Sequence, residues 1–163
     1  MNKNKELLLL SHFRQNARES LTRISRRTSI PVSTIFDKLK TYENEVISKH
    51  TSLLDFRKLG FDLKAHLLFK VDKERREAFQ GFLMSHPQVN NIFRINNGYD
   101  YLIEAVFTGL GDLDGFFEAA SKNGAEERQE YFVLKDVARE QFLTYKPGFE
   151  KTTAQDLALK RRA

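Results

Sequence analysis

Two short helical patterns, interrupted by a proline, occur in residues 21–44, which read LTRISRRTSIPVSTIFDKLKTYEN. Ser20 is a favourable N-cap, so the first helix is expected over residues 21–28. Pro31 breaks the pattern and is tolerated in a first helical turn, which places the second helix over residues 32–44. Two short helices joined by a tight turn are typical of a helix-turn-helix, whose second helix enters the major groove of DNA.

The outward face of the second helix carries polar and basic groups. Its apolar residues Ile35, Leu39 and Tyr42 recur at helical spacing and are expected to face inward. The other positions, together with the arginines of the first helix, are candidates for contacts with base edges and phosphates. These candidate DNA-binding residues are Arg23, Arg26, Arg27, Val32, Ser33, Thr34, Asp37, Lys38, Lys40 and Thr41. Asp37, the acidic member, could accept from a cytosine amino group or pair with a neighbouring cation. A three-helix interaction module that binds no DNA is the alternative.

The flanking segments complete the expected N-terminal domain. Residues 3–15 carry a broad apolar stripe and predict an amphipathic helix. Residues 46–53 are β-prone and are interpreted as a short hairpin. We therefore expect a winged helix-turn-helix domain over residues 1–52, followed by a linker over residues 53–62.

The second part of the chain alternates between strand and helix patterns. Apolar residues occupy every second position of residues 63–71, as in a strand with one buried face. Asn97 and Gly98 predict a type I′ hairpin turn. The expected elements are strands over 63–71, 89–95, 99–107 and 129–137 and helices over 74–85 and 110–120. This βαββαβ order predicts an α+β chain whose ferredoxin-like domain spans residues 63–137, with both helices on one sheet face and residues 138–163 as a tail.

The opposite sheet face is expected to be apolar and to need a cover. The alternation places Leu68, Ile92, Leu102 and Val106 on that face, with His66 and Arg94 beside them. A homodimer that buries this face is the simplest explanation, and its two-fold axis would present two helix-turn-helix domains to a pseudo-palindromic double-stranded DNA site.

Charge is divided unevenly along the 163 residues. Residues 1–62 hold 12 Lys and Arg against 7 Asp and Glu, whereas residues 63–137 hold 9 against 12. A basic head on an acidic body is typical of nucleic-acid binding through the head. The tail holds 6 against 3, and its basic end at Lys160, Arg161 and Arg162 is expected to add nonspecific phosphate contacts.

The composition argues against several other classes. There is no cysteine, which excludes disulfides and thiolate metal sites, and the longest early apolar run has only four residues. We therefore expect a cytoplasmic protein with no membrane partner. The 4 histidines show no metal-ligand spacing, and no phosphate-binding or nucleophile motif occurs. The sequence predicts no catalytic residue, no metal and no cofactor, and hence no enzyme.

Several short motifs together resemble the Lrp/AsnC (feast/famine) transcription regulators, particularly the archaeal ones. The motifs are IPVSTI at residues 30–35, TSLLD at 51–55, KLGF at 58–61 and GYDYL at 98–102. The resemblance covers residues 5–137. It implies a DNA-binding head, a C-terminal RAM domain that often binds amino acids, and dimers that assemble into octamers. The family's DNA-contacting helix falls on residues 32–44.

The resemblance also supplies candidate effector-binding residues between the second and third strands. They are Asn97, Gly98, Tyr99, Asp100 and Tyr101. The family often reads Gly-Asp-Tyr-Asp-Tyr here, whereas this chain has its glycine one position further along. A plain hairpin turn, with Asp100 and Tyr101 packing or hydrogen-bonding across a dimer, is therefore an equal alternative to a ligand site. For the whole protein, the alternatives are a ligand-sensing module without DNA binding and an enzyme that resembles the sirohaem decarboxylases.

Overall fold

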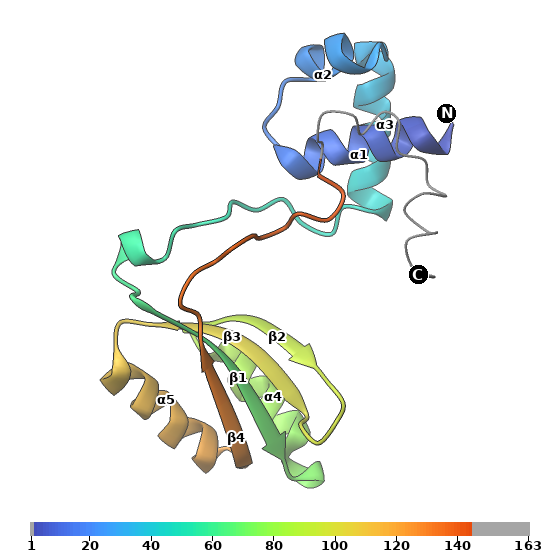
Figure 1. The fold of residues 1–163 in the computed structure, drawn as a ribbon. Helices are drawn as coiled ribbons and strands as arrows, with labels where there is room; N and C mark the ends of the chain where they lie inside the picture. The colour runs from blue at the N-terminus through green and yellow to red at the C-terminus, as the bar shows by residue number, and fades with distance from the viewer. Residues whose placement is uncertain (1, 145–163) are drawn as a thin grey trace, which may run out of the picture. The chain divides into compact units, whose positions relative to one another are not determined.

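The computed structural model describes residues 2–144 and divides them into two compact units (Figure 1). The helical unit contains residues 2–52 together with residues 138–144, and the sheet unit contains residues 53–137. The helices are α1 (Lys3–Gln15), α2 (Leu21–Thr28), α3 (Val32–Glu45), α4 (Arg76–Ser85) and α5 (Leu110–Lys122), with short 3-10 helices η1 (Arg57–Leu59) and η2 (Lys73–Arg75). The strands are β1 (Leu63–Val71), β2 (Val89–Arg94), β3 (Tyr101–Phe107) and β4 (Ala125–Phe132).

The helical unit contains the predicted helix-turn-helix. The Oγ atom of Ser20 accepts a hydrogen bond from the Arg23 N–H at 3.3 Å and so caps α2. Ser29 adopts a left-handed conformation after α2, and Pro31 is extended immediately before α3. One small core joins the three helices and consists of Leu9, Phe13, Ile24, Ile30, Ile35 and Tyr42. The turn therefore fixes α2 against α3, as the sequence predicted.

The prediction of a hairpin over residues 46–53 is wrong. The structure describes this whole stretch and shows neither strand nor helix after α3 until η1. The Ile47 N–H donates to the Tyr42 carbonyl at 2.6 Å, and Ile47 packs against the helical core. An isolated two-stranded hairpin is marginally stable in water. Packing of Ile47 on the helices anchors the chain here without a strand partner.

The sheet unit confirms the ferredoxin-like arrangement. Its strands are all antiparallel and lie in the order β2-β3-β1-β4, with α4 and α5 on one face (Figure 1). Every second residue of β1 and β3 faces these helices, and all of these residues except the half-buried Leu63 are buried. Asn97 and Gly98 both have positive φ, at 69° and 93°, as the predicted turn requires.

The fourth strand lies earlier than the sequence predicted. The pattern placed it over residues 129–137, but β4 runs from Ala125 to Phe132 because it pairs along β1, with Val71 opposite Ala125 and Ala65 opposite Phe132. It is an edge strand with a mostly exposed, charged sequence, which hides the expected alternation. β2, β3 and α4 are each one or two residues shorter than predicted.

Two residues were assigned to the wrong face of the sheet. Ile92 pairs with Ile103 and packs against the core below the helices, and Arg94 pairs with Tyr101 on the same side. The cause is an irregularity in β2 between Val89 and Asn91, because one additional residue inverts the alternation beyond it. Leu68, Leu102 and Val106 do lie on the face opposite the helices, which we call the open face. Phe93, opposite Leu102, joins them there with 51% of its surface exposed.

Candidate nucleic-acid interface

The three candidate arginines of α2 differ in how they are held. Arg23 and Arg27 both reach the carboxylate of Glu19, with Nε of Arg23 at 3.4 Å and Nη1 of Arg27 at 3.0 Å. Glu19 is almost fully buried and also contacts Nδ1 of His12 at 3.2 Å. The side chain of Arg26 is exposed and makes no hydrogen bond or ion pair within residues 2–144. The internal carboxylate therefore positions two arginines, and the third is available to an external anion.

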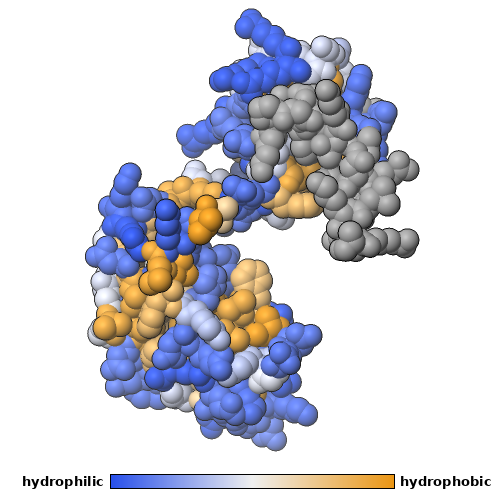
Figure 2. Space-filling view, in the orientation of Figure 1, coloured by the Kyte–Doolittle hydropathy of each residue, from blue (hydrophilic) through white to orange (hydrophobic). Residues whose placement is uncertain are grey.

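The exposed face of α3 carries five of the candidate residues. Val32, Ser33, Asp37 and Lys40 are exposed along the first three turns, and Thr34 is half-buried beside them. The Nζ atom of Lys40 lies 4.4 Å from the ring centroid of the exposed Phe36. Figure 2 shows mainly hydrophilic surface over α2, the neighbouring helix. Side chains of α3 and Arg26 of α2 are thus available at the surface of the helical unit.

Two further candidates on α3 are engaged within the unit. Nζ of Lys38 forms an ion pair with Oε1 of Glu6 on α1 at 3.1 Å, and both side chains are about two-thirds buried. The Oγ1 atom of Thr41 donates to the carbonyl of Asp37 at 3.1 Å. Lys38 therefore faces α1, and the structure does not bring it together with the exposed residues.

Sequence reasoning missed the acidic residues that organise this unit. The spacing of Glu19 and Arg23 by four residues is a recognisable helical pair, although Glu19 precedes the helix. Glu6 is 32 positions from Lys38, so no local pattern could have revealed their contact. Burial, and to a lesser extent the Glu6 carboxylate, raises the pKa of Tyr42 to about 12, so the phenol is neutral at physiological pH.

The candidate effector loop is anchored by Asp100. One carboxylate oxygen accepts the Val71 N–H at 2.9 Å, and the other lies 2.6 Å from Nη2 of Arg76. Arg94 approaches the same oxygen at 3.9 Å. The buried Tyr101 donates its hydroxyl hydrogen to the Arg76 carbonyl at 2.9 Å. Asp100 and Tyr101 therefore hold the hairpin against α4 within one chain.

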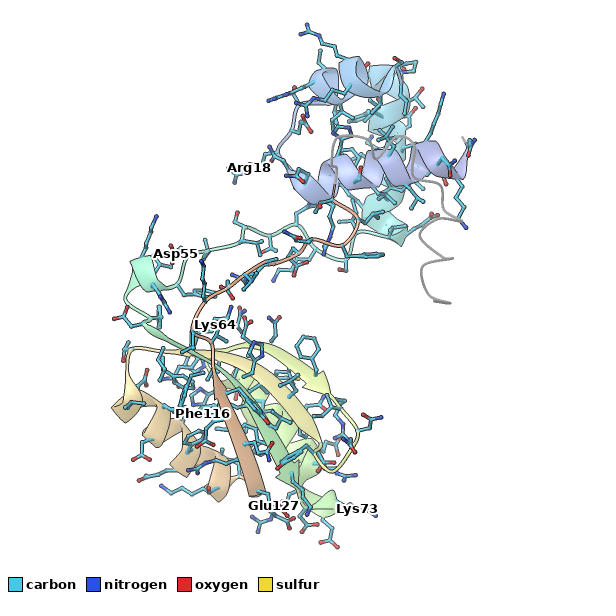
Figure 3. All side chains as sticks on the ribbon, in the orientation of Figure 1. Arg18, Asp55, Lys64, Lys73, Phe116 and Glu127 are labelled. Carbon is cyan, nitrogen blue, oxygen red and sulfur yellow. The ribbon has the colours of Figure 1, made fainter. Side chains whose placement is uncertain are left out.

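A shallow hollow of about 380 Å³ lies beside this loop. Gly98, Tyr99 and Asp100 line it, whereas Asn97 and Tyr101 do not. The other lining residues are Lys70, Val71, Asp72, Lys73, Arg76 and Glu126. A hydrogen bond from Nζ of Lys70 to Glu127 raises the pKa of that amine. Lys73 and Glu127 lie at the same end of the sheet unit (Figure 3). The hollow thus presents charges of both signs, some of them already paired.

Other kinds of site find no support in the part of the chain that the structure describes. Residues 2–144 contain no group of three or more histidine and acidic side chains arranged to hold a metal ion. None of the helices in these residues is long and apolar enough to cross a membrane. The predicted phosphate contacts at Lys160, Arg161 and Arg162 lie outside the described residues.

Comparison with known proteins gives relatives over most of the chain. No family model matches. An HTH-type transcriptional regulator of Pyrococcus furiosus is 23% identical over 135 residues, which are 82% of this chain and 91% of that protein. A transcriptional regulator of Neisseria meningitidis, solved in complex with L-Met, matches the structure with a TM-score of 0.79 at 24% identity. The match covers 85% of this chain and 93% of the Neisseria chain. AsnC of Escherichia coli matches with a TM-score of 0.76 at 13% identity. This match covers 88% of this chain and 99% of the AsnC chain.

These relatives are named as regulators of transcription and not as enzymes, which argues against the sirohaem-decarboxylase alternative. The solved structures cover both the helix-turn-helix and the ferredoxin-like domain. The resemblance stated from the sequence is therefore confirmed: the relatives of this chain are named as HTH-type transcriptional regulators, and its fold is that of the Lrp/AsnC regulators.

Proposed function

We propose that this regulator binds double-stranded DNA sequence-specifically through α2 and α3, in the cytoplasm. The observation that carries the proposal is the exposed face of α3, which lies next to a helix with three arginines. A helix-turn-helix places such a face against base edges in the major groove, while neighbouring cations meet the phosphates. The net charge of +5 over residues 1–62 favours an anionic partner.

The candidate residues divide into two proposed roles. Arg23, Arg26 and Arg27 would contact phosphates, which fix the position of the protein without reading sequence. The exposed residues of α3 would read bases. These are Val32, Ser33, Thr34 and Asp37, while Lys40 beside them would reach a phosphate. We assign Lys38 and Thr41 to supporting α3, because both side chains bond within the helical unit.

A homodimer through the open face would complete the binding unit. Phe93 and Tyr131 expose 51% and 56% of their surfaces there, beside the half-buried Leu68 and Leu102. Large exposed apolar patches mark interaction surfaces. A two-fold axis would make the preferred site pseudo-palindromic, and further association of dimers into octamers would be compatible with the same interface.

A small-molecule effector is the second part of the proposal. The hollow beside Gly98 and Tyr99 is its proposed site, and an amino acid carries the two opposite charges that the lining can pair. The Neisseria relative, solved with L-Met, favours this class of ligand. Asn97, Asp100 and Tyr101 would shape the loop, since Asp100 and Tyr101 already bond to β1 and α4.

Selection of bound duplexes from a random pool tests the proposed function. The full chain should enrich a pseudo-palindrome and bind it at least a thousandfold more tightly than a scrambled duplex, on the order of known specific regulators. Fluorescence anisotropy at several salt concentrations gives both affinities. Equal binding to every sequence would identify an architectural protein, and no binding would favour the ligand-sensing module; either result would overturn sequence-specific regulation.

Replacing Arg26 by alanine should weaken binding of all duplexes by a similar factor. A phosphate contact carries no sequence information, and its loss should lower the slope of log affinity against log salt by about 1. Anisotropy titrations of the selected and the scrambled duplex measure both effects. Arg75→Ala is the matched control, because Arg75 is an exposed arginine of the sheet unit. Loss of preference at one base position alone would assign Arg26 to base reading instead.

A further inference from the structure

Two apolar side chains stand exposed on the face of α3 that the proposed function places in the major groove. Val32 and Phe36 have 42% and 46% of their surfaces exposed and lie one helical turn apart. Among the described residues of α1, α2 and α3, they are the only large apolar side chains exposed to this extent. Leu39 and Ile35 on the same helix contribute to the core, so the packing of the unit leaves Phe36 unused.

The surroundings of Phe36 indicate a partner that is both anionic and locally apolar. Nζ of Lys40 lies over the Phe36 ring, 4.4 Å from its centroid, so a positive charge stands directly beside the apolar contact. Ser33 and Asp37 flank the pair, and both are exposed. An apolar surface of two side chains, bordered by a cation and hydrogen-bonding groups, is too small for a stable protein interface. It matches the size of one or two methyl groups on base edges.

We infer that Val32 and Phe36 form a methyl reader that contacts the C5 methyl groups of thymines in the major groove. This inference rests on the proposed function. The methyl group is the single apolar feature that distinguishes a thymine edge in that groove, and apolar side chains are its complement. Phe36 supplies the larger contact, Val32 extends it by one turn toward the start of α3, and Lys40 holds the ring while pairing with a nearby phosphate.

Substitution of deoxyuridine for single thymines in the selected duplex tests the methyl reader. Deoxyuridine keeps base pairing and hydrogen-bonding groups and removes only the C5 methyl. At one or two positions in each half-site, the wild-type chain should bind the uracil duplex about fourfold less tightly, as expected for burial of one methyl group. At the position that Phe36 contacts, the Phe36→Ala chain should bind the thymine and uracil duplexes equally.

The comparison between duplexes separates contact from folding. A variant with a disturbed helical unit would bind both duplexes more weakly and keep their ratio. Phe36→Leu, which retains an apolar side chain, should keep part of the discrimination. Val46→Ala is the control, because Val46 is also exposed, at 59%, but lies just after α3. This control should keep the full wild-type ratio.

The outcomes distinguish the two proposals. Failure of the wild-type chain to prefer any duplex would overturn sequence-specific binding and the methyl reader with it. A specific duplex whose thymines can all be replaced without loss of affinity would overturn the methyl reader alone. Wild-type discrimination that persists at every such position in Phe36→Ala would overturn the role of Phe36, even if overall affinity falls.

Discussion

Replacing Phe116 by alanine should lower the free energy of unfolding of the sheet unit by about 3–5 kcal/mol, the range for truncating a buried phenylalanine. Phe116 of α5 is 2% exposed and lies at the centre of the aromatic core (Figure 3). Its ring centroid lies 4.7 Å from that of His86, 5.5 Å from Phe107 and 6.2 Å from Phe69. The substitution therefore removes contacts with both helices and the sheet, and leaves a cavity that these neighbours cannot fill.

Urea unfolding followed by circular dichroism measures this loss. Leu110→Ala is the control, because Leu110 lies on the same helix with 69% of its surface exposed. It should change the unfolding free energy by less than about 0.5 kcal/mol. The burial of His86 beside Phe116 lowers the pKa of that imidazole. A cost for Phe116→Ala no larger than that of the control would contradict the central place of the ring.

Replacing Asp100 by alanine should cost the sheet unit about 2–3 kcal/mol. The buried carboxylate accepts the Val71 N–H and pairs with Arg76, and both would lose their partner inside the protein. Breaking a buried ion pair costs about 3–5 kcal/mol, and the partial exposure of Arg76 reduces that figure. The same unfolding experiment measures the effect, with Asp114→Ala on the exposed surface of α5 as the control.

The Asp100 variant also decides what the loop carboxylate does. If it anchors the hairpin, stability falls whether or not an amino acid is present. If it instead holds the proposed amino-acid effector, the unfolding free energy without ligand stays near that of the wild type, and the stabilisation that added L-methionine is expected to give the wild type disappears. Unchanged stability together with lost stabilisation would thus reject the anchoring role.

The sequence predicted those elements whose signals are local. The N-cap Ser20, the break at Pro31 and the Asn97-Gly98 turn each act within a few residues, and the structure confirms all three. The prediction that Ile92 lies on the open face was wrong because one irregular residue in β2 inverts the alternation of side chains. Counting a sequence pattern cannot detect such an irregularity. The position of β4 depends on where β1 ends, and this is a pairing between distant segments.

The candidate site shows the same division. Helical spacing correctly separated the buried residues of α3, Ile35 and Tyr42, from its outward face. It could not show that Lys38 turns toward α1, because the attraction comes from Glu6 far away in the sequence. The commitment of Asp100 to Val71 and Arg76 likewise depends on the closed sheet.

The ion pair between Lys38 and Glu6 has a consequence for protein engineering. A recognition helix is often exchanged between regulators as a separate cassette. Here α3 carries an ammonium group whose partner belongs to α1, so a transplanted α3 would bring an unmatched cation into its new host. Glu6 and Lys38 should be moved together, and the smallest interchangeable unit of this regulator is therefore all three helices.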